Sequence, residues 1–191
     1  MIRKLSALVG TLLVLSSLSA RAADESGAFA GVAVGRSDFS LSNLSVPLKD
    51  KDGRDTTFKL YGGYRFDERF SLEAGYARLG TLGATAGLAG GDVRQEGRGQ
   101  SLYAVGAARL LMNGPFALSG RLGIARNKVS GSNLLSAADS LQGSRTSAVW
   151  GLGAEYKLSD KLSLTADYDN YGKLSDRVKA SSFTVGLRSS F

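Results

Sequence analysis

Three runs with one pattern decide the fold: FSLEAGYARLG (70–80), FALSGRLGIAR (116–126) and LSLTADYDNYG (162–172). Each alternates large apolar residues with small or polar ones, and successive runs start 46 residues apart. A short polar segment, DER, MNG or SD, stands just before each run. Alternation with period two predicts a strand, and the fixed spacing predicts a unit of turn, strand, long polar loop and returning strand.

Eight segments of the chain carry this alternation. They are residues 28–37, 56–66, 69–78, 99–111, 116–127, 145–157, 161–171 and 179–191. Strands of this length exceed the usual 5–6 residues of soluble sheets and match the roughly 9–11 that a tilted strand needs to cross a bilayer. The long polar connections, 38–55, 79–98, 128–144 and 172–178, alternate with short ones. The sequence therefore predicts an all-β, eight-stranded antiparallel up-and-down transmembrane β-barrel, with short periplasmic turns and long extracellular loops.

The first 22 residues have the pattern of a secretory signal peptide. Arg3 and Lys4 are followed by a mostly apolar stretch (5–19) and by the small-residue site Ala20-Arg21-Ala22. A membrane-spanning helix would need about 20 apolar residues, and this run is shorter. We expect residues 1–22 to be removed, leaving one barrel domain, 23–191, that is exported to the outer membrane.

The composition argues against nucleic-acid binding and excludes disulfide bonds. The net charge of +7 falls to +4 without the basic residues of the signal peptide, and the remaining basic residues are dispersed. An exported chain rarely meets nucleic acid, so this basicity points weakly to anionic lipid headgroups near the loops. There is no cysteine and no histidine. An exported domain without cysteine must be stable without disulfides.

The apolar face of the strands ends in aromatic residues beside the short turns. They are Tyr64, Phe66, Phe70, Phe116, Tyr156 and Phe191. Aromatic side chains of this kind prefer membrane interfaces, so these six are predicted to form an interfacial girdle at the inner side. Strand 99–111 leaves its facing open, because LYAVGAARLL is apolar on both sides.

The charged face must point inward if the apolar face meets lipid. A basic residue facing lipid at the midplane would cost about 2–4 kcal/mol, whereas charges that face each other can pair. The alternative, a soluble sandwich, would bury the apolar face and expose the charges. The expected inward set has five basic and four acidic members: Lys59, Arg65, Glu73, Arg121, Glu155, Lys157, Asp167, Asp169 and Arg188.

The chain resembles the OmpA/OmpX-type small barrels of the Gram-negative outer membrane, a porin-like group. The stretches that carry this resemblance are YGGYRFDERFSLEAGYARLG (61–80), FALSGRLGIAR (116–126), GLGAEYKL (151–158), LSLTADY (162–168) and FTVGLRSSF (183–191). Their succession is specific, although each is degenerate. The resemblance covers the whole chain after the signal peptide.

The resemblance implies an ionic network that occludes the lumen. Glu73, Arg121, Glu155 and Asp167 match the inward charged positions of such barrels, and Lys59 matches more loosely. These charges could equally be structural pairs without a gating role. The resemblance also implies that a terminal pattern, Phe183, Val185, Leu187 and Phe191, is recognised by the barrel-assembly machinery.

An enzyme is not expected. Outer-membrane barrels of similar size that are enzymes use histidine, the usual general base near neutral pH, and this chain has none. Asp167 and Asp169 could form a carboxylate dyad, but the resemblance makes them ion-pair partners in the lumen. We expect no catalytic residue, no metal and no cofactor. Gly151 and Gly153 are strand glycines, because the helix of a dinucleotide fold does not follow them.

Two functions from different classes remain open. The first is a structural or adhesin-like surface-interaction barrel with an occluded lumen. The second is a small porin-like diffusion channel for ions or small solutes. The expected partners are outer-membrane lipid and lipopolysaccharide, the barrel-assembly machinery, and a host or surface ligand bound through the loops. We expect a monomer.

Overall fold

The structure is a computed structural model that describes residues 26–41, 48–52, 54–88, 91–131, 143–175 and 178–191. The expected signal peptide lies outside the described residues. The described residues form nine strands: β1 (Gly27–Leu41), β2 (Leu48–Asp52), β3 (Arg54–Arg65), β4 (Phe70–Leu88), β5 (Gly91–Asn113), β6 (Phe116–Gly131), β7 (Gly143–Lys157), β8 (Leu162–Lys173) and β9 (Val178–Ser190). Among these residues no helix is long and apolar enough to cross a membrane.

Eight of the strands close into one antiparallel barrel. The sheet runs β4-β3-β1-β9-β8-β7-β6-β5, and β5 pairs again with β4. The first and last strands pair from Phe29 opposite Ser190 to Leu41 opposite Val178. Because every barrel strand has a neighbour on both sides, no edge of the barrel is left with unpaired backbone groups. The predicted fold class is confirmed.

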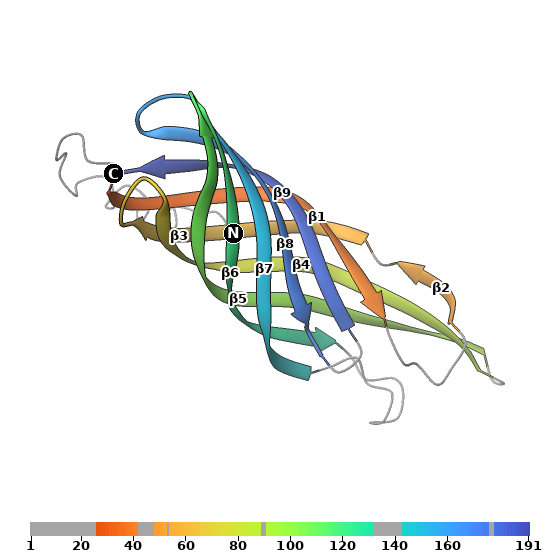
Figure 1. Cartoon of the computed structure of the whole chain (residues 1–191). Coiled ribbons are helices and arrows are strands. Elements are labelled where there is room, and N and C mark those ends of the chain that lie inside the picture. Colours follow the sequence, from red (N-terminus) through yellow and green to blue (C-terminus); the bar gives the residue numbers. More distant parts are fainter. Residues whose placement is uncertain (1–25, 42–47, 53, 89–90, 132–142, 176–177) are drawn as a thin grey trace, which may run out of the picture.

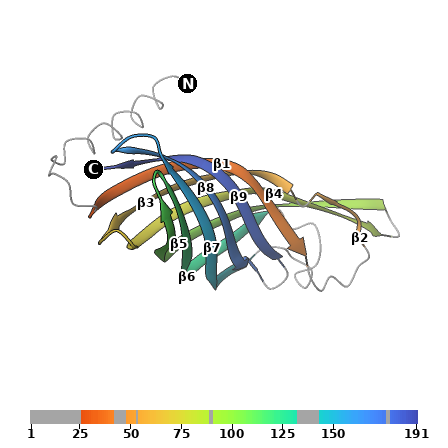
Figure 2. The same cartoon turned by 45° about the horizontal axis from the view of Figure 1, so that its top comes forward.

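The connections 66–69, 114–115 and 158–161 lie at one end of the barrel, which we call the short-turn end, and the opposite end is the far end. The carboxyl end of the chain also lies at the short-turn end, where the Phe191 N–H donates to the Ala28 carbonyl at 2.9 Å. At the far end β4 and β5 continue as a hairpin that projects beyond the other barrel strands (Figures 1 and 2). Strand β2 pairs with this projecting part of β4, from Leu48 opposite Ala86 to Asp52 opposite Gly83.

The prediction of a loop over residues 79–98 is wrong. Its residues extend β4 and β5, which stay paired to Leu88 opposite Gly91. The long predicted loop 38–55 is likewise shorter, because it contains the end of β1, all of β2 and the start of β3. The ends of 128–144 and 172–178 belong to strands too. Alternation of side chains reveals a strand only where one face of the sheet is apolar. Backbone hydrogen bonds can continue the strand pairing through a stretch rich in glycine and polar residues, where no such alternation exists.

A bulge marks the point where β4 leaves the barrel wall. The β4–β5 register shifts between Arg78 and Gly80. Gly80 has a φ of +85°, a left-handed conformation that glycine adopts without a steric penalty. The side chain of Asp55 fills the space beside it, and Asp55 Oδ2 accepts a hydrogen bond from the Thr81 N–H at 2.5 Å.

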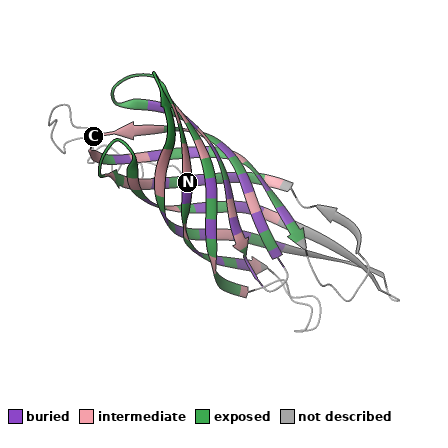
Figure 3. Cartoon of the chain, viewed as in Figure 1, coloured by how far each residue is buried: buried purple, intermediate pink, exposed green. Residues whose placement is uncertain are grey.

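Buried and exposed residues alternate along the barrel strands, as the banding in Figure 3 shows. Large apolar side chains cover the outer surface of all eight strands, with Leu122 of β6 exposed by 69%. The inner surface is polar at mid-height, where Lys59 is fully buried. An apolar outside and a polar inside are the reverse of a soluble barrel, so the soluble sandwich is excluded.

Strand β5 settles the facing that the sequence left open. Leu102 is exposed by 62% on the outer surface, whereas Ser101, Tyr103 and Val105 are buried inside. Arg109 keeps the inward register, and the register shifts between Arg109 and Leu111.

Candidate functional site: the barrel interior

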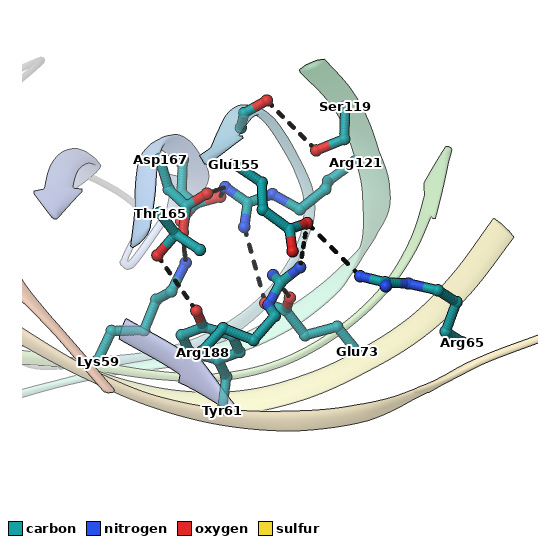
Figure 4. Close-up of polar contacts among 12 residues, drawn as sticks. Lys59, Tyr61, Arg65, Glu73, Ser119, Arg121, Glu155, Thr165, Asp167 and Arg188 are labelled. Carbon is teal, nitrogen blue, oxygen red and sulfur yellow. Dashed lines mark hydrogen bonds and ion pairs between the residues drawn. The ribbon is translucent and has the colours of Figure 1, made fainter. Parts of the chain in front are cut away.

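Four charged side chains meet at mid-height inside the barrel, from strands that are not neighbours (Figure 4). Lys59 Nζ of β3 lies 2.9 Å from Asp167 Oδ2 and 2.9 Å from Asp169 Oδ2, both on β8. Arg121 Nη2 of β6 lies 3.0 Å from Asp167 Oδ1 and 2.9 Å from Asp169 Oδ1. Two cations and two carboxylates therefore form a closed quartet, in which each charge has two opposite neighbours.

Glu73 of β4 links this quartet to the short-turn side. Its Oε1 lies 3.8 Å from Arg121 Nη1 and accepts a hydrogen bond from Tyr103 Oη at 2.8 Å. Its Oε2 lies 3.3 Å from Arg188 Nη2 on β9. Glu73 is thus a junction between two arginines and a tyrosine.

A second cluster surrounds Glu155 of β7. Glu155 Oε2 lies 3.3 Å from Arg188, 3.2 Å from Arg109 and 3.5 Å from Arg65. Arg188 joins the two clusters, because its two terminal nitrogens contact Glu73 and Glu155. All the buried charges therefore belong to one network, as a low-dielectric interior requires.

Aromatic rings support the cations of the network. Lys59 Nζ lies 5.0 Å from the centre of the Tyr61 ring. The Arg188 guanidinium lies 4.6 Å from the Phe29 ring and 5.3 Å from the Tyr61 ring. Tyr61 Oη also lies 3.3 Å from Thr165 Oγ1. These ring faces offer further attraction to positive charge.

The structure brings together the five residues expected in the ionic network, namely Lys59, Glu73, Arg121, Glu155 and Asp167. Of the wider inward set, Lys157 does not join. Its side chain is half exposed at the barrel mouth and lies 3.8 Å from Asp160. Arg109 joins the network although the sequence did not predict it there. The inward position of Arg109 follows only from the register of β5. The sequence did not give that register, because residues 99–111 are apolar on both faces.

An apolar layer lies inside the barrel beyond the network, toward the far end. This layer was not predicted from the sequence. Its members are buried, and they include Phe39, Leu79, Val129, Val149, Tyr171, Leu174 and Val178. Phe39 and Leu174 meet over Gly99, where a Cβ atom would stand 3.0 Å and 3.1 Å from them. The signal was present, because Val129 and Val149 occupy inward positions of the alternation.

A pocket of about 590 Å³ occupies the short-turn end of the lumen. Arg65, Arg109 and Glu155 line its inner part, and Phe116 and Phe191 lie at its rim. The lumen thus holds an open pocket, the ionic network and the apolar layer in sequence along the barrel axis.

Among the described residues, no group of three or more His, Cys, Asp or Glu could hold a metal ion. Asp167 and Asp169 contact cations through both carboxylate oxygens. The dyad that the sequence suggested is therefore an ion-pair cluster.

The six aromatic residues of the predicted girdle lie exposed near the short turns. Phe116 and Tyr156 form one contact, with ring centres 4.6 Å apart, and Tyr64 and Phe66 form another at 5.6 Å. Phe183, Val185 and Leu187 point outward along β9, and Phe191 follows the strand. Their expected roles at the interface and in assembly stay predictions.

Comparisons with known proteins identify the family. Residues 10–191 match the model of the outer membrane protein beta-barrel domain. None of the curated proteins compared with the chain matches it significantly.

Solved structures of small outer-membrane barrels share the fold. Neisserial surface protein A (NspA) has a TM-score of 0.59 at 16% identity, covering 88% of this chain and 100% of that chain. OprG of Pseudomonas aeruginosa has a TM-score of 0.60 at 14% identity, covering 86% and 96%. Ail, the attachment invasion locus protein of Yersinia pestis, has a TM-score of 0.52 at 21% identity, covering 86% and 99%. The resemblance drawn from the sequence is confirmed, and the chain belongs to the outer membrane protein β-barrel domain family and to the outer membrane.

Proposed function

We propose that this protein is a non-enzymatic outer-membrane barrel with an occluded lumen and a structural or surface-interaction role. It is exported by a cleaved signal peptide, residues 1–22, and inserted by the barrel-assembly machinery. The short turns face the periplasm. One observation carries the proposal: the buried network that joins β3, β4, β6, β7, β8 and β9 across the lumen. An eight-stranded barrel is only just wide enough for side chains to fill.

The apolar layer adds a second closure to the proposed plug. Because Phe39 and Leu174 meet above the ionic network, breaking the network alone should not open a continuous water path. Planar-bilayer recordings of four proteins test this double closure: wild type, Arg121→Gln, Phe39→Ala/Leu174→Ala, and the combined variant.

We expect steady conductance from the combined variant only. Leu118→Ala, a change on the outer surface, controls for general loosening of the barrel, and heat-modifiable gel mobility verifies folding. Steady conductance from the wild type would overturn the occluded lumen and favour a diffusion channel.

The alternative is a small porin-like channel for ions or small solutes. The pocket at the short-turn end favours it, because the entrance to a pore already exists there. The charged residues that line this entrance give it a positive surplus: Arg65, Arg109, Lys157 and Lys161 against Glu155 and Asp160. A conducting wild type should therefore prefer anions, which reversal potentials in a salt gradient would measure.

A surface-interaction role is supported by the projecting β4–β5 hairpin, which would extend outside the cell in the proposed orientation. A structure of Ail, a barrel of similar fold, contains the heparin analogue sucrose octasulfate. We propose that this hairpin contacts a host or surface ligand. Replacing residues 82–96 with a short turn should abolish the attachment of bacteria that carry the protein to host cells, while the barrel still folds. Unchanged attachment would exclude the hairpin as the contact.

A further inference from the structure

Four basic side chains gather on the outer surface of the barrel near the far end. They are Arg78 on β4, Arg98 on β5, and Arg126 and Lys128 on β6, and we call them the basic patch. All four are exposed. The strands are adjacent, and the register places Gln100 of β5 opposite both Arg78 and Lys128. Arg126 stands opposite Leu102, one step nearer the short turns. The patch therefore covers three neighbouring strands at one height.

The basic patch begins where the apolar belt of the barrel ends. The next outward residues toward the short turns are Tyr76, Leu102 and Ile124, exposed by 40%, 62% and 63%. Tyr76 Oη donates a hydrogen bond to Gln100 Oε1 at 3.0 Å across this boundary. A tyrosine with a polar partner at such a boundary is typical of a membrane interface.

A hollow of about 360 Å³ joins the patch to the belt. Tyr76 and Leu102 form its apolar part, and Arg126, Lys128 and Ser144 form its polar part. An amphiphile with an anionic head and apolar chains would meet matching chemistry on both sides.

Opposite charge is missing from this surface among the side chains that the structure describes. At the outward positions of these strands whose side chains the structure describes, 76 and 78 on β4, 98, 100 and 102 on β5, 124, 126 and 128 on β6, and 144, 146 and 148 on β7, none is Asp or Glu. No described residue forms an ion pair with any of the four basic side chains. Exposed guanidinium and ammonium groups without a protein partner attract phosphate, which arginine can bind through two parallel hydrogen bonds.

We propose that the basic patch binds the phosphate groups of a phosphorylated glycolipid of the outer leaflet, whose acyl chains lie along Leu102 and Ile124. The proposal rests on the membrane orientation given under the proposed function, which puts the far end at the outer leaflet. It does not depend on whether the lumen conducts. Juxtamembrane basic residues each contribute to the attraction of anionic lipid, so paired removal should have a clear effect.

The test compares lipid binding by the protein folded in detergent micelles, measured by native mass spectrometry with bis-phosphorylated lipid A. The probe variant is Arg126→Gln/Lys128→Gln. The matched control is Arg36→Gln/Lys179→Gln, which removes the same charge from outward positions of β1 and β9, away from the patch. A charge-preserving variant, Arg126→Lys/Lys128→Arg, separates charge from packing.

We expect the probe variant to weaken lipid A binding about tenfold or more, and the control and charge-preserving variants to change it less than twofold. Dephosphorylated lipid A should bind the wild type at least tenfold more weakly. Equal losses in the probe and control variants would overturn the proposal. So would equal binding of phosphatidylglycerol, which would indicate a general anionic-lipid surface, or tighter binding of soluble heparin, which would indicate a soluble polyanion site.

Discussion

Arg121 and Asp169 form an ion pair of 2.9 Å although β7 separates their strands. Gly151 of β7 lies between them, and it is the absence of a side chain there that lets the two charges meet. A Cβ atom at Gly151 would stand 2.5 Å from Asp169 Oδ1 and 2.6 Å from the Tyr168 carbonyl oxygen. The ion pair of two strands is thus made possible by a residue on a third.

Gly151→Ala should destabilise the barrel by about 1–3 kcal/mol, because the added methyl group meets a carboxylate oxygen and a backbone oxygen that cannot both move away. Urea unfolding in lipid vesicles would measure the loss. Gly106→Ala is the matched control, since its Cβ would face outward with only the Leu122 carbonyl oxygen 4.0 Å away. Equal stability of the two variants would show that the space at Gly151 is not needed.

Arg121→Gln should destabilise the barrel by about 3–5 kcal/mol, because it leaves Asp167 and Asp169 to share Lys59 alone in a buried site. Asp169→Asn in the same protein should recover part of that loss. A double-mutant cycle with the two single variants should give a coupling of roughly 0.5–3 kcal/mol. Additive effects, with no coupling, would contradict the quartet.

Leu122→Arg tests which environment surrounds the barrel. Leu122 is already exposed by 69%, so the substitution would be nearly neutral in water. At the middle of a bilayer an arginine facing lipid should cost about 2–4 kcal/mol. Folding in vesicles should reveal this cost, whereas Glu68→Arg in the exposed β3–β4 turn should have little effect. A neutral Leu122→Arg would be inconsistent with a lipid-facing surface.

Asp67, in the turn between β3 and β4, should contribute to the acid sensitivity of the protein. Its Oδ1 accepts hydrogen bonds from the N–H groups of Arg69 and Phe70, each at 2.7 Å. These two hydrogen bonds hold the pKa of Asp67 below its usual value of about 3.9, and the bond from the Phe70 N–H has the larger effect.

A carboxylate whose folded pKa is depressed stabilises the protein above its unfolded pKa and loses that contribution as pH falls through the folded pKa. The difference in unfolding free energy between wild type and Asp67→Ala should therefore be constant from pH 7 to about pH 5. It should shrink as the pH falls below about 3.9. A difference that stays the same at low pH would refute the role of the charged form.

The residues around the turns show what alternation can and cannot predict. Period two puts Phe70, Leu72 and Tyr76 on the apolar face of one strand and Glu73 on its charged face, and in the structure the first three are exposed and Glu73 is buried. Alternation did not predict the length of the β4–β5 hairpin. Outside the apolar belt there is no one-sided apolar pattern to read, while the backbone ladder continues.

The interior shows a similar division. The inward charges on β3, β4, β6, β7, β8 and β9 were expected from the sequence. Arg109 and the layer formed by Phe39, Leu79 and Leu174 were not. Lys157 occupies an inward position of the alternation, but it lies too near the barrel mouth to reach the network. The position of a residue in the alternation gives the side of the sheet that it faces. It does not give the height along the barrel axis at which side chains of two distant strands meet.

The sequence by itself determined the number of barrel strands, their antiparallel order and the face that each presents, because these depend on local alternation and on the lengths of the connections. Only the tertiary structure decided which charges pair, where the lumen is polar or apolar, and which basic residues gather on the outer surface. Those features depend on the stagger between strands when the sheet closes. Closure brings together residues such as Lys59 and Asp167, which are 108 positions apart in the chain.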